Sequence, residues 1–209
     1  MSKGTVLSNA SVYVVDDDLA VRESLSSLIR SAGLAVEVFE SAREFLARRD
    51  LSEHCCLVLD LRMPEIDGFE LQQQLASDQR EIPIIFVTGH GDVPQAVRAI
   101  KAGALEFLRK PFNDEELLAA IRQALALSDG NCRQRAALAG LRERFAALTA
   151  REREVLFKVV QGRPNKSVAS ELGVSESTVK VHRHNIMAKM RVASLPELAL
   201  AMQRLSKRD

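Results

Sequence analysis

Residues 56–64 read CLVLDLRMP: four apolar residues lead directly into Asp60, and Pro64 closes the turn that follows. An apolar run of this length, bounded by a turn signal, predicts a strand that is buried on both faces of a parallel sheet. An acidic residue at the end of a strand is commonly a helix cap or a solvated loop residue. The alternative is that the carboxylate of Asp60 performs a reaction, and the rest of the chain decides between these two interpretations.

From residue 11 to about residue 127, the chain alternates between short apolar runs and amphipathic, helix-like stretches. Strands joined by such helices predict an α/β fold, a doubly wound parallel sheet covered on both faces, with right-handed crossovers. We expect five strands in the flavodoxin-like order 2-1-3-4-5. The runs that form them are SVYVV, AVEVF, CCLVLD, IPIIFVT and LEFLRK.

The chain has 209 residues, 46% of them apolar, which is enough for two small domains with cores of their own. No apolar run approaches the ~18 residues that a membrane span needs, and the opening MSKGTVLSNA lacks the apolar centre of a signal peptide. These features predict a cytoplasmic protein without membrane contact. The three cysteines are odd in number and include the neighbours Cys55 and Cys56, so we expect packing residues rather than a disulfide framework.

The overall net charge of +1 hides an asymmetry between two parts of the chain. Residues 1–125 carry 13 basic and 20 acidic side chains, a net charge of −7, whereas residues 126–209 carry 16 and 8, a net charge of +8. A basic C-terminal part favours a polyanionic partner such as double-stranded DNA. A solvated basic face without a partner is the alternative.

Apolar residues recur at helical spacing from Leu138 to Leu148, which predicts an amphipathic helix between the two parts. The sequence leaves open whether this helix continues the preceding one through Gly130. Thr149 and Glu152 then form a capping box that starts the first of four short helices. We therefore expect a first domain over residues 8–127, a helical linker over residues 128–145 and a small all-α domain over residues 146–209.

Polar residues stand at the ends of four of the five expected strands. They are Asp16, Asp17 and Asp18 after the first strand, Asp60 after the third, Thr88 at the end of the fourth and Lys110 after the fifth. The carboxyl ends of parallel strands meet at one edge of a sheet, and ligands bind there, where the strand order reverses. We expect Asp16, Asp17 and Asp60 to meet at this point, while Asp18 caps the following helix.

Crowded carboxylates repel one another unless a cation compensates their charge. Mg²⁺, or another divalent cation such as Mn²⁺, prefers oxygen ligands and suits this set better than zinc, for which the sequence has no Cys and His cluster. With Thr88 and Lys110 on the far side, the site fits a phosphoryl group, and Asp60 can act as a nucleophile that forms an aspartyl-phosphate.

Two other classes of protein compete with this interpretation. One is a phosphatase that uses an Asp nucleophile with Mg²⁺; such enzymes typically carry a second Asp two residues on, where this chain has Arg62. The other is a regulator that is not phosphorylated and acts through protein contacts alone. The complete set of acidic, hydroxyl and lysine side chains at the strand ends argues against the second class.

The motifs are VVDDD at 14–18, LVLDLRMPEIDG at 57–68, VTGHGD at 87–92 and AIKAGALEFLRKPF at 99–112. With them the sequence resembles a two-component response regulator of the FixJ type. The resemblance implies that Asp60 accepts a phosphoryl group from the phosphohistidine of a partner histidine kinase, so that the protein is a phosphoacceptor rather than an enzyme. It also implies a set of ligands: Asp17, Asp60 and the backbone carbonyl of Arg62 bind Mg²⁺ directly, Asp16 binds it through water, and Thr88 and Lys110 contact the phosphoryl oxygens.

The same resemblance implies a switch. Phe107 matches a rotating aromatic residue that is coupled to Thr88, although an ordinary core residue of the fifth strand is the alternative. Such domains commonly form homodimers on phosphorylation. Lys110-Pro111 matches a cis peptide bond of the family, and Arg62 and His90 match positions that tune the lifetime of the phosphate.

Residues 167–190, SVASELGVSESTVKVHRHNIMAKM, have the order helix, glycine turn and helix that is typical of a helix-turn-helix. From TAREREVL at 149–156 onward, this part resembles the LuxR-type DNA-binding domain. The resemblance implies regulation of transcription, with activation as the expected direction, and a dimer contact through the last helix, residues 196–205. RNA polymerase is a further candidate partner.

The second helix of this motif carries the residues that we expect to read DNA. The resemblance places Lys180, Val181 and His184 against the bases. Val181 is apolar but off the core face, which suits contact with a thymine methyl group, although single exposed valines are common. Phosphate contacts are expected from Asn165, Lys166, Ser177, Thr178, Arg183 and Lys189.

Overall fold

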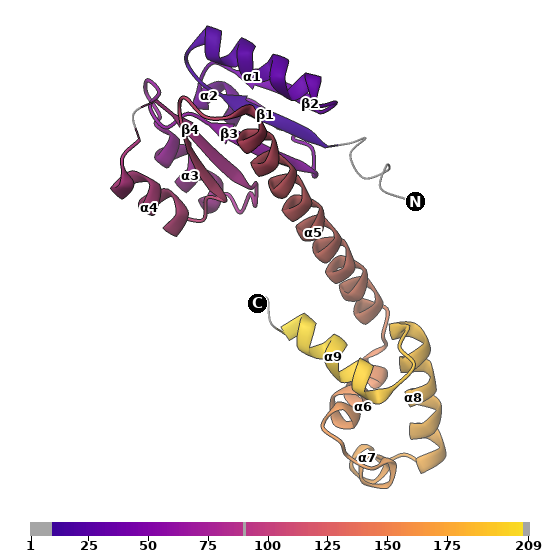
Figure 1. Ribbon diagram of the computed structural model, residues 1–209. Coiled ribbons are helices and arrows are strands. Elements are labelled where there is room, and N and C mark those ends of the chain that lie inside the picture. The colour runs from indigo at the N-terminus through magenta and orange to yellow at the C-terminus, as the bar shows by residue number, and fades with distance from the viewer. Residues whose placement is uncertain (1–9, 90, 207–209) are drawn as a thin grey trace. The chain divides into compact units, whose positions relative to one another are not determined.

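A computed structural model describes residues 10–89 and 91–206, which form two compact units (Figure 1). The division between the units falls between Cys132 and Arg133. Each unit has hydrophobic core clusters of its own, as the length and composition of the chain predicted.

Five parallel strands form one sheet in the order β2-β1-β3-β4-β5, which confirms the predicted strand order and fold class. The strands are β1 (Ser11–Val15), β2 (Ala35–Phe39), β3 (Cys55–Leu59), β4 (Ile84–Thr88) and β5 (Glu106–Arg109). Every residue of β3 and β4 is buried. Their uninterrupted apolar sequences therefore reflect contact with a helix layer on each face of the sheet.

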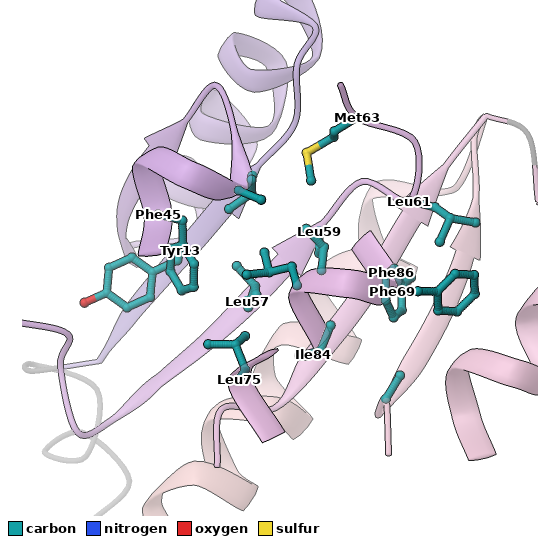
Figure 2. Close-up of a cluster of buried hydrophobic side chains, with 14 of the residues drawn as sticks. Tyr13, Phe45, Leu57, Leu59, Leu61, Met63, Phe69, Leu75, Ile84 and Phe86 are labelled. Carbon is teal, nitrogen blue, oxygen red and sulfur yellow. The ribbon is translucent and has the colours of Figure 1, made fainter. Parts of the chain in front are cut away.

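Helices cover both faces of the sheet (Figure 1). One core lies under α1 (Leu19–Ser31) and the first part of α5 (Asp114–Ala146), and the other lies under α2 (Ala42–Ala47), α3 (Gly68–Ser77) and α4 (Val93–Lys101). Because side chains alternate along a strand, Val14 belongs to the first core and its neighbour Val15 to the second. Figure 2 shows the second core, where Leu57 and Leu59 of β3 pack in the same cluster as Leu75 of α3.

α5 is one continuous helix of 33 residues that passes through Gly130 without a break, which answers the question that the sequence left open. Side chains on both sides of Gly130 hold α5 to the segment before β3. Ser128 Oγ accepts from the Cys55 N–H at 3.1 Å and donates to the Glu53 carbonyl at 3.1 Å, and Cys132 Sγ donates to the same carbonyl at 2.9 Å. These bonds offset the roughly 1 kcal/mol that a glycine costs inside a helix.

The three cysteines are thiols rather than halves of disulfides, and all are buried. Cys55 and Cys56 follow each other on β3 and point into opposite cores of the sheet. Burial raises the pKa of the Cys56 thiol above its ordinary value, since the thiolate would be desolvated there. The cysteines are packing residues, as the sequence predicted.

The second unit begins with the last part of α5. Its described residues then form α6 (Ala150–Val160), α7 (Asn165–Leu172), α8 (Glu176–Met190) and α9 (Leu195–Ser206). The predicted capping box is present, because Thr149 Oγ1 accepts the Glu152 N–H at 3.2 Å and Glu152 Oε2 accepts the Thr149 N–H at 2.8 Å. Val155, Ile186 and Leu198 bring α6, α8 and α9 into one core. Among the described residues, no helix combines the length and the apolar character that crossing a membrane requires.

Candidate functional site

Asp16 and Asp60 meet at the carboxyl edge of the sheet. β1 and β3 pair with Val15 opposite Leu59, so the residues that follow these two lie side by side. The Asp60 N–H donates to the Val15 carbonyl at 2.8 Å and extends this pairing by one residue. Both acidic residues are buried, with exposed fractions of 2% for Asp16 and 7% for Asp60. The structure thus brings two of the predicted site residues together.

Lys110 places a positive charge between these carboxylates. It follows β5, and its backbone N–H donates to the Thr88 carbonyl at 2.8 Å. Its Nζ lies 2.7 Å from Asp16 Oδ2 and 3.2 Å from Asp60 Oδ1. The peptide bond between Lys110 and Pro111 is cis, as expected. One ammonium group therefore bridges two carboxylates that lie 94 and 50 residues away in the sequence.

Burial raises the pKa of the Asp60 carboxyl above its ordinary value. The charge of Lys110 and the Arg62 N–H, which donates to Asp60 Oδ2 at 2.7 Å, lower this pKa, and Asp16 raises it. Burial alone would lower the pKa of Lys110, but the hydrogen bonds and charges of Asp16 and Asp60 outweigh it and raise that pKa. One lysine does not fully compensate the two buried carboxylates, so further positive charge would be stabilised at this site.

The oxygen atoms at this edge fit a hard divalent cation. Mg²⁺ usually binds through one or two carboxylates and several waters, and Asp16 and Asp60 already share one cationic partner. Asp17, the third carboxylate expected at this edge, is exposed. Within residues 10–89 and 91–206, no three Asp, Glu, His or Cys side chains converge on one point. The fit therefore rests on two carboxylates.

The loop between β1 and α1 contains one residue that the sequence reasoning identified correctly and one that it missed. Asp18 caps α1 as expected, since its Oδ1 accepts the N–H groups of Ala20 at 2.8 Å and Val21 at 3.3 Å. Arg22 was missed; its Nη1 donates to the Asp16 carbonyl at 2.7 Å and holds the acidic loop. A basic residue one turn into a helix that follows an acidic loop is the signal that could have identified it.

Thr88 and Phe107 lie on the neighbouring strands β4 and β5. In the pairing of these strands, Thr88 is opposite Arg109 and Phe86 is opposite Phe107. Thr88 is buried, whereas Phe107 is half-buried at the margin of the core, with its ring centroid 6.2 Å from that of Phe86. His90, expected to influence the phosphate lifetime, lies outside the described residues.

In the second unit, α7 and α8 form the predicted helix-turn-helix. Gly173, with φ of 65°, ends α7, and the Ser175 side chain caps α8 by accepting the Thr178 N–H at 3.1 Å. Val179, Ile186 and Met190 of α8 are buried. The three residues expected to read bases are exposed and, at positions i, i+1 and i+4, share one side of the helix; they are Lys180, Val181 and His184.

All six candidates for phosphate contact lie on α7 or α8, the two helices of the helix-turn-helix. Asn165 of α7 and Arg183 of α8 are paired, with Arg183 Nη1 donating to Asn165 Oδ1 at 2.7 Å. Lys166 is exposed at the start of α7. The hydroxyl groups of Ser177 and Thr178 both lie within hydrogen-bond distance of Ser175 Oγ at the start of α8.

The sixth candidate, Lys189, is occupied elsewhere. Its Nζ lies 2.7 Å from Oε2 of Glu152 on α6 and 3.5 Å from the Ala147 carbonyl. Glu152 is only 3% exposed. The hydrogen bond from Lys189 is the largest cause that lowers the pKa of the Glu152 carboxyl below its ordinary value. Lys189 therefore compensates a buried charge at the far end of α8.

Two sequence families match successive parts of the chain. The family described as "Response regulator receiver domain" matches residues 12–122, and the one described as "Bacterial regulatory proteins, luxR family" matches residues 146–202. The chain belongs to the two-component response regulators. The regulator is 52% identical to the response regulator protein TodT of Pseudomonas putida over 93% of this chain and 86% of TodT. It is 48% identical to the transcriptional regulatory protein FixJ of Azorhizobium caulinodans over 90% of this chain and 89% of FixJ.

A solved structure of the response regulator StyR resembles this regulator with a TM-score of 0.84 at 50% identity, over 94% of this chain and 100% of that chain. The combination of a receiver domain with a LuxR-type domain implies a histidine kinase as partner and DNA as target of the regulator. Its family is one of transcription regulators rather than of enzymes in the usual sense, and receiver domains of this family normally bind Mg²⁺.

Proposed function

We propose that Asp60 is the phosphoacceptor of this response regulator. It takes a phosphoryl group from the phosphohistidine of a partner kinase in the cytoplasm, and phosphorylation changes dimerisation and DNA binding so that transcription is activated. The observation that supports this most directly is the buried cluster in which Lys110 bridges Asp60 and Asp16. An ordinary helix cap or loop acid would not need a lysine partner at the switch point of the sheet.

The reaction is a phosphoryl transfer between two side chains. A carboxylate oxygen of Asp60 attacks the phosphorus, a P–O bond forms as the P–N bond breaks, and the imidazole of the kinase leaves with the electron pair of that bond. Lys110, with Nζ 3.2 Å from Asp60 Oδ1, balances negative charge on the transferred oxygens. Thr88 at the end of β4 offers them a hydroxyl donor.

When bound, Mg²⁺ or Mn²⁺ would supply the remaining positive charge for the carboxylates and the phosphoryl oxygens. The residues that would hold the ion are Asp16, Asp17, Asp60 and the backbone carbonyl of Arg62. The bond from the Arg62 N–H to Asp60 supports this set, because it keeps the Arg62 backbone beside the carboxylate. Asp17 would join only if its exposed side chain turns toward Asp60.

Thr88 and Phe107 form the switch that reads the state of Asp60. The phosphoryl group draws Thr88 toward it, and the Phe107 ring moves in response, which changes the surface of α4, β5 and α5 where two receivers pair. The half-buried position of Phe107 supports this role, because a ring at the margin of a core has an alternative place toward solvent.

The C-terminal domain binds double-stranded DNA through α8. Lys180, Val181 and His184 read bases, and their exposure on one side of the helix supports that assignment. The phosphate contacts come from Asn165, Lys166, Ser177, Thr178 and Arg183. We assign no phosphate contact to Lys189, because its ammonium group binds Glu152 within the domain.

A dimer through α9 would read two half-sites one helical turn apart. RNA polymerase would be the partner of the bound dimer.

We assign residues 8–127 to the receiver, residues 128–145 to the linker and residues 146–209 to the DNA-binding domain. The family matches over residues 12–122 and 146–202 support both outer assignments. The linker consists of the later part of α5.

Phosphorylation is tested by incubating the protein with Mg²⁺ and a small phosphodonor and measuring the phosphate that stays attached. Asp60→Asn should lose this label, whereas the control Asp67→Asn, which alters the acid that caps α3 in the following loop, should keep it. Equal labelling of wild type and Asp60→Asn would contradict the proposal. A gel shift with a paired operator site, with and without phosphodonor, then measures the coupling to DNA binding.

A further inference from the structure

Gly91, in the loop between β4 and α4, lies against both residues of the proposed switch. A Cβ atom built on Gly91 would lie 2.6 Å from Cε1 and 2.7 Å from Cζ of Phe107, and 2.9 Å from Cγ2 of Thr88. Carbon atoms of separate groups normally stay about 3.5–4.0 Å apart. No side chain fits at this position while Phe107 and Thr88 keep their places.

Glycine at position 91 leaves the space that the Phe107 ring and the Thr88 methyl group border.

The Phe107 ring cannot retreat from Gly91 into the core, because a row of aromatic side chains closes that direction. Phe86 packs on Phe107. Phe69 packs on Phe86 in turn, with ring centroids 5.6 Å apart (Figure 2). The guanidinium of Arg98 on α4 covers the far side of Phe69, 4.1 Å from the ring centroid. A ring displaced from Gly91 therefore has solvent as its open direction.

We propose that Gly91 is a positioning residue of the switch: it leaves the space that the Phe107 ring occupies beside Thr88, and a side chain at position 91 forces that ring outward. This proposal rests on the proposed function, in which movement of Phe107 transmits phosphorylation of Asp60 to the output surface. A methyl group at position 91 would then remove the inner position of the ring, because its two shortest contacts are to the Phe107 ring, while its contact with Thr88 is to the methyl group and not to the hydroxyl that serves the phosphoryl group. Phosphorylation and DNA binding would be uncoupled.

The test uses Gly91→Ala in the full chain, with Gly89→Ala as the matched control. Gly89 lies in the same loop, and a Cβ atom there meets nothing within 4 Å. In Gly91→Ala, phosphate labelling with Mg²⁺ and a small phosphodonor should stay within about twofold of wild type. The gain in operator affinity on phosphorylation, which for allosteric coupling is typically about 5–150-fold, should largely disappear. Gly89→Ala should retain both properties.

The position of the ring is read independently by ¹⁹F NMR on protein that contains fluorophenylalanine, with the Phe107 signal assigned by Phe107→Leu. Gly91→Ala should move this signal to a solvent-exposed environment, and Gly89→Ala should not. If the wild type takes no phosphate, the proposed function fails while the ¹⁹F result still decides the steric role. The inference would be overturned if phosphorylation raised the operator affinity of Gly91→Ala as much as that of wild type. It would also be overturned if Gly91→Ala lost phosphate labelling while the ¹⁹F signal of Phe107 stayed in place.

A double variant covers the case in which Gly91→Ala does not fold. Phe107→Leu removes the ring that the new methyl group would strike, so Gly91→Ala with Phe107→Leu should fold as well as Phe107→Leu alone. A double variant as unstable as Gly91→Ala would show that the contact with Thr88, and not the one with the Phe107 ring, decides the conflict, and this result would overturn the inference.

Discussion

The ammonium of Lys110 and the carboxylate of Asp16 lie 2.7 Å apart and form an ion pair in which the Asp16 side chain is only 3% exposed. This pair does not depend on Asp60. When the charge of Asp60 is removed, Lys110 still has a buried partner. The effect of substituting Asp60 therefore comes from the loss of the Asp60 carboxylate, because Lys110 keeps its ion pair with Asp16.

Asp60→Asn should increase the free energy of unfolding at neutral pH. Burial raises the pKa of Asp60, so the folded state binds its proton more tightly than the unfolded state. Stability from this group is complete below the ordinary pKa of 3.8 and is lost as pH rises through the raised pKa. Asparagine does not titrate, and the advantage of the variant should shrink as pH falls toward 3.8. Urea unfolding of both proteins between pH 3.5 and 7 measures the difference in their free energies of unfolding. If that difference did not change with pH, the pKa of Asp60 would not be raised in the folded state.

Added Mg²⁺ should make the wild type more stable than Asp60→Asn. A cation bound at Asp16 and Asp60 would stabilise the wild type by mass action, with ~2.7 kcal/mol expected at a hundredfold excess over the dissociation constant. Asp60→Asn should respond much less because it has lost one of two buried carboxylates. Thermal unfolding with and without 10 mM MgCl₂, matched for ionic strength by NaCl, provides the measurement. Equal shifts in both proteins would place the ion elsewhere.

Lys189→Met should destabilise the second unit by about 1–3 kcal/mol, because Glu152 then remains buried without its lysine partner. Lys189 lowers the pKa of Glu152, so this stability is present above the ordinary value of 4.5 and fades as pH falls below it. The effect of the variant should therefore be smallest in acid. Denaturant unfolding at pH 7 and pH 4 tests this prediction.

DNA titrations with the same variant separate a structural lysine from a phosphate contact. Lys166→Met, which alters an exposed lysine at the start of α7, should reduce the slope of log affinity against log salt by about one unit. Lys189→Met should leave that slope unchanged at a temperature where the protein is folded. The reverse result would return Lys189 to the DNA interface.

Val181→Ala should weaken discrimination at one base pair of the operator by about 1 kcal/mol, because a thymine methyl group would lose its apolar partner. Val181 is 58% exposed, so the stability of the protein should change by less than about 0.5 kcal/mol. Val179→Ala is the control: this fully buried neighbour should cost about 1.5–3 kcal/mol of stability. A saturation set of operator variants, measured at fixed salt, identifies the affected position, and unchanged discrimination throughout would leave Val181 without a role in DNA reading.

Ser128→Ala should destabilise the first unit by about 1–3 kcal/mol, because its hydroxyl serves both the Cys55 N–H and the Glu53 carbonyl in a buried position. Amide hydrogen exchange should quicken locally in α5 around Gly130. The matched control is Ser77→Ala, which removes an exposed serine hydroxyl from α3. Similar effects of both substitutions would mean that α5 does not depend on this anchor.

The sequence predicted the sheet and the meeting of Asp16, Asp60 and Lys110 at its carboxyl edge, because those features depend on local signals. An unbroken apolar run identifies a central strand, and the residue that follows it, such as Asp60, must lie at the carboxyl edge. The continuity of α5 could not be predicted in the same way. Gly130 resembles a helix end in the sequence, and the residue that anchors this part of α5, Glu53, is 75 residues from Ser128.

The details of individual side chains were harder to predict for a related reason. Lys189 was expected to contact a DNA phosphate because it is a lysine on the helix that was expected to bind DNA. Its partner in the structure, Glu152, lies 37 residues earlier, so no local pattern indicated the pair. Asp17 was expected to lie with Asp16 and Asp60, yet it is exposed in the bend that follows β1, where the regular alternation of a strand no longer fixes the side chain. The importance of Gly91 depends on where the Phe107 ring lies, which no local pattern in the sequence reveals.

The burial of all three cysteines, each of which lies in the described part of the chain, has a practical consequence. A thiol-reactive dye reacts with exposed thiolates, so the folded wild-type protein should take up little label. One cysteine introduced at an exposed position, such as Ser77 on α3, can therefore carry a fluorophore or a spin label with low background. The movements inferred for the switch can then be followed in solution while the native cysteines stay in place.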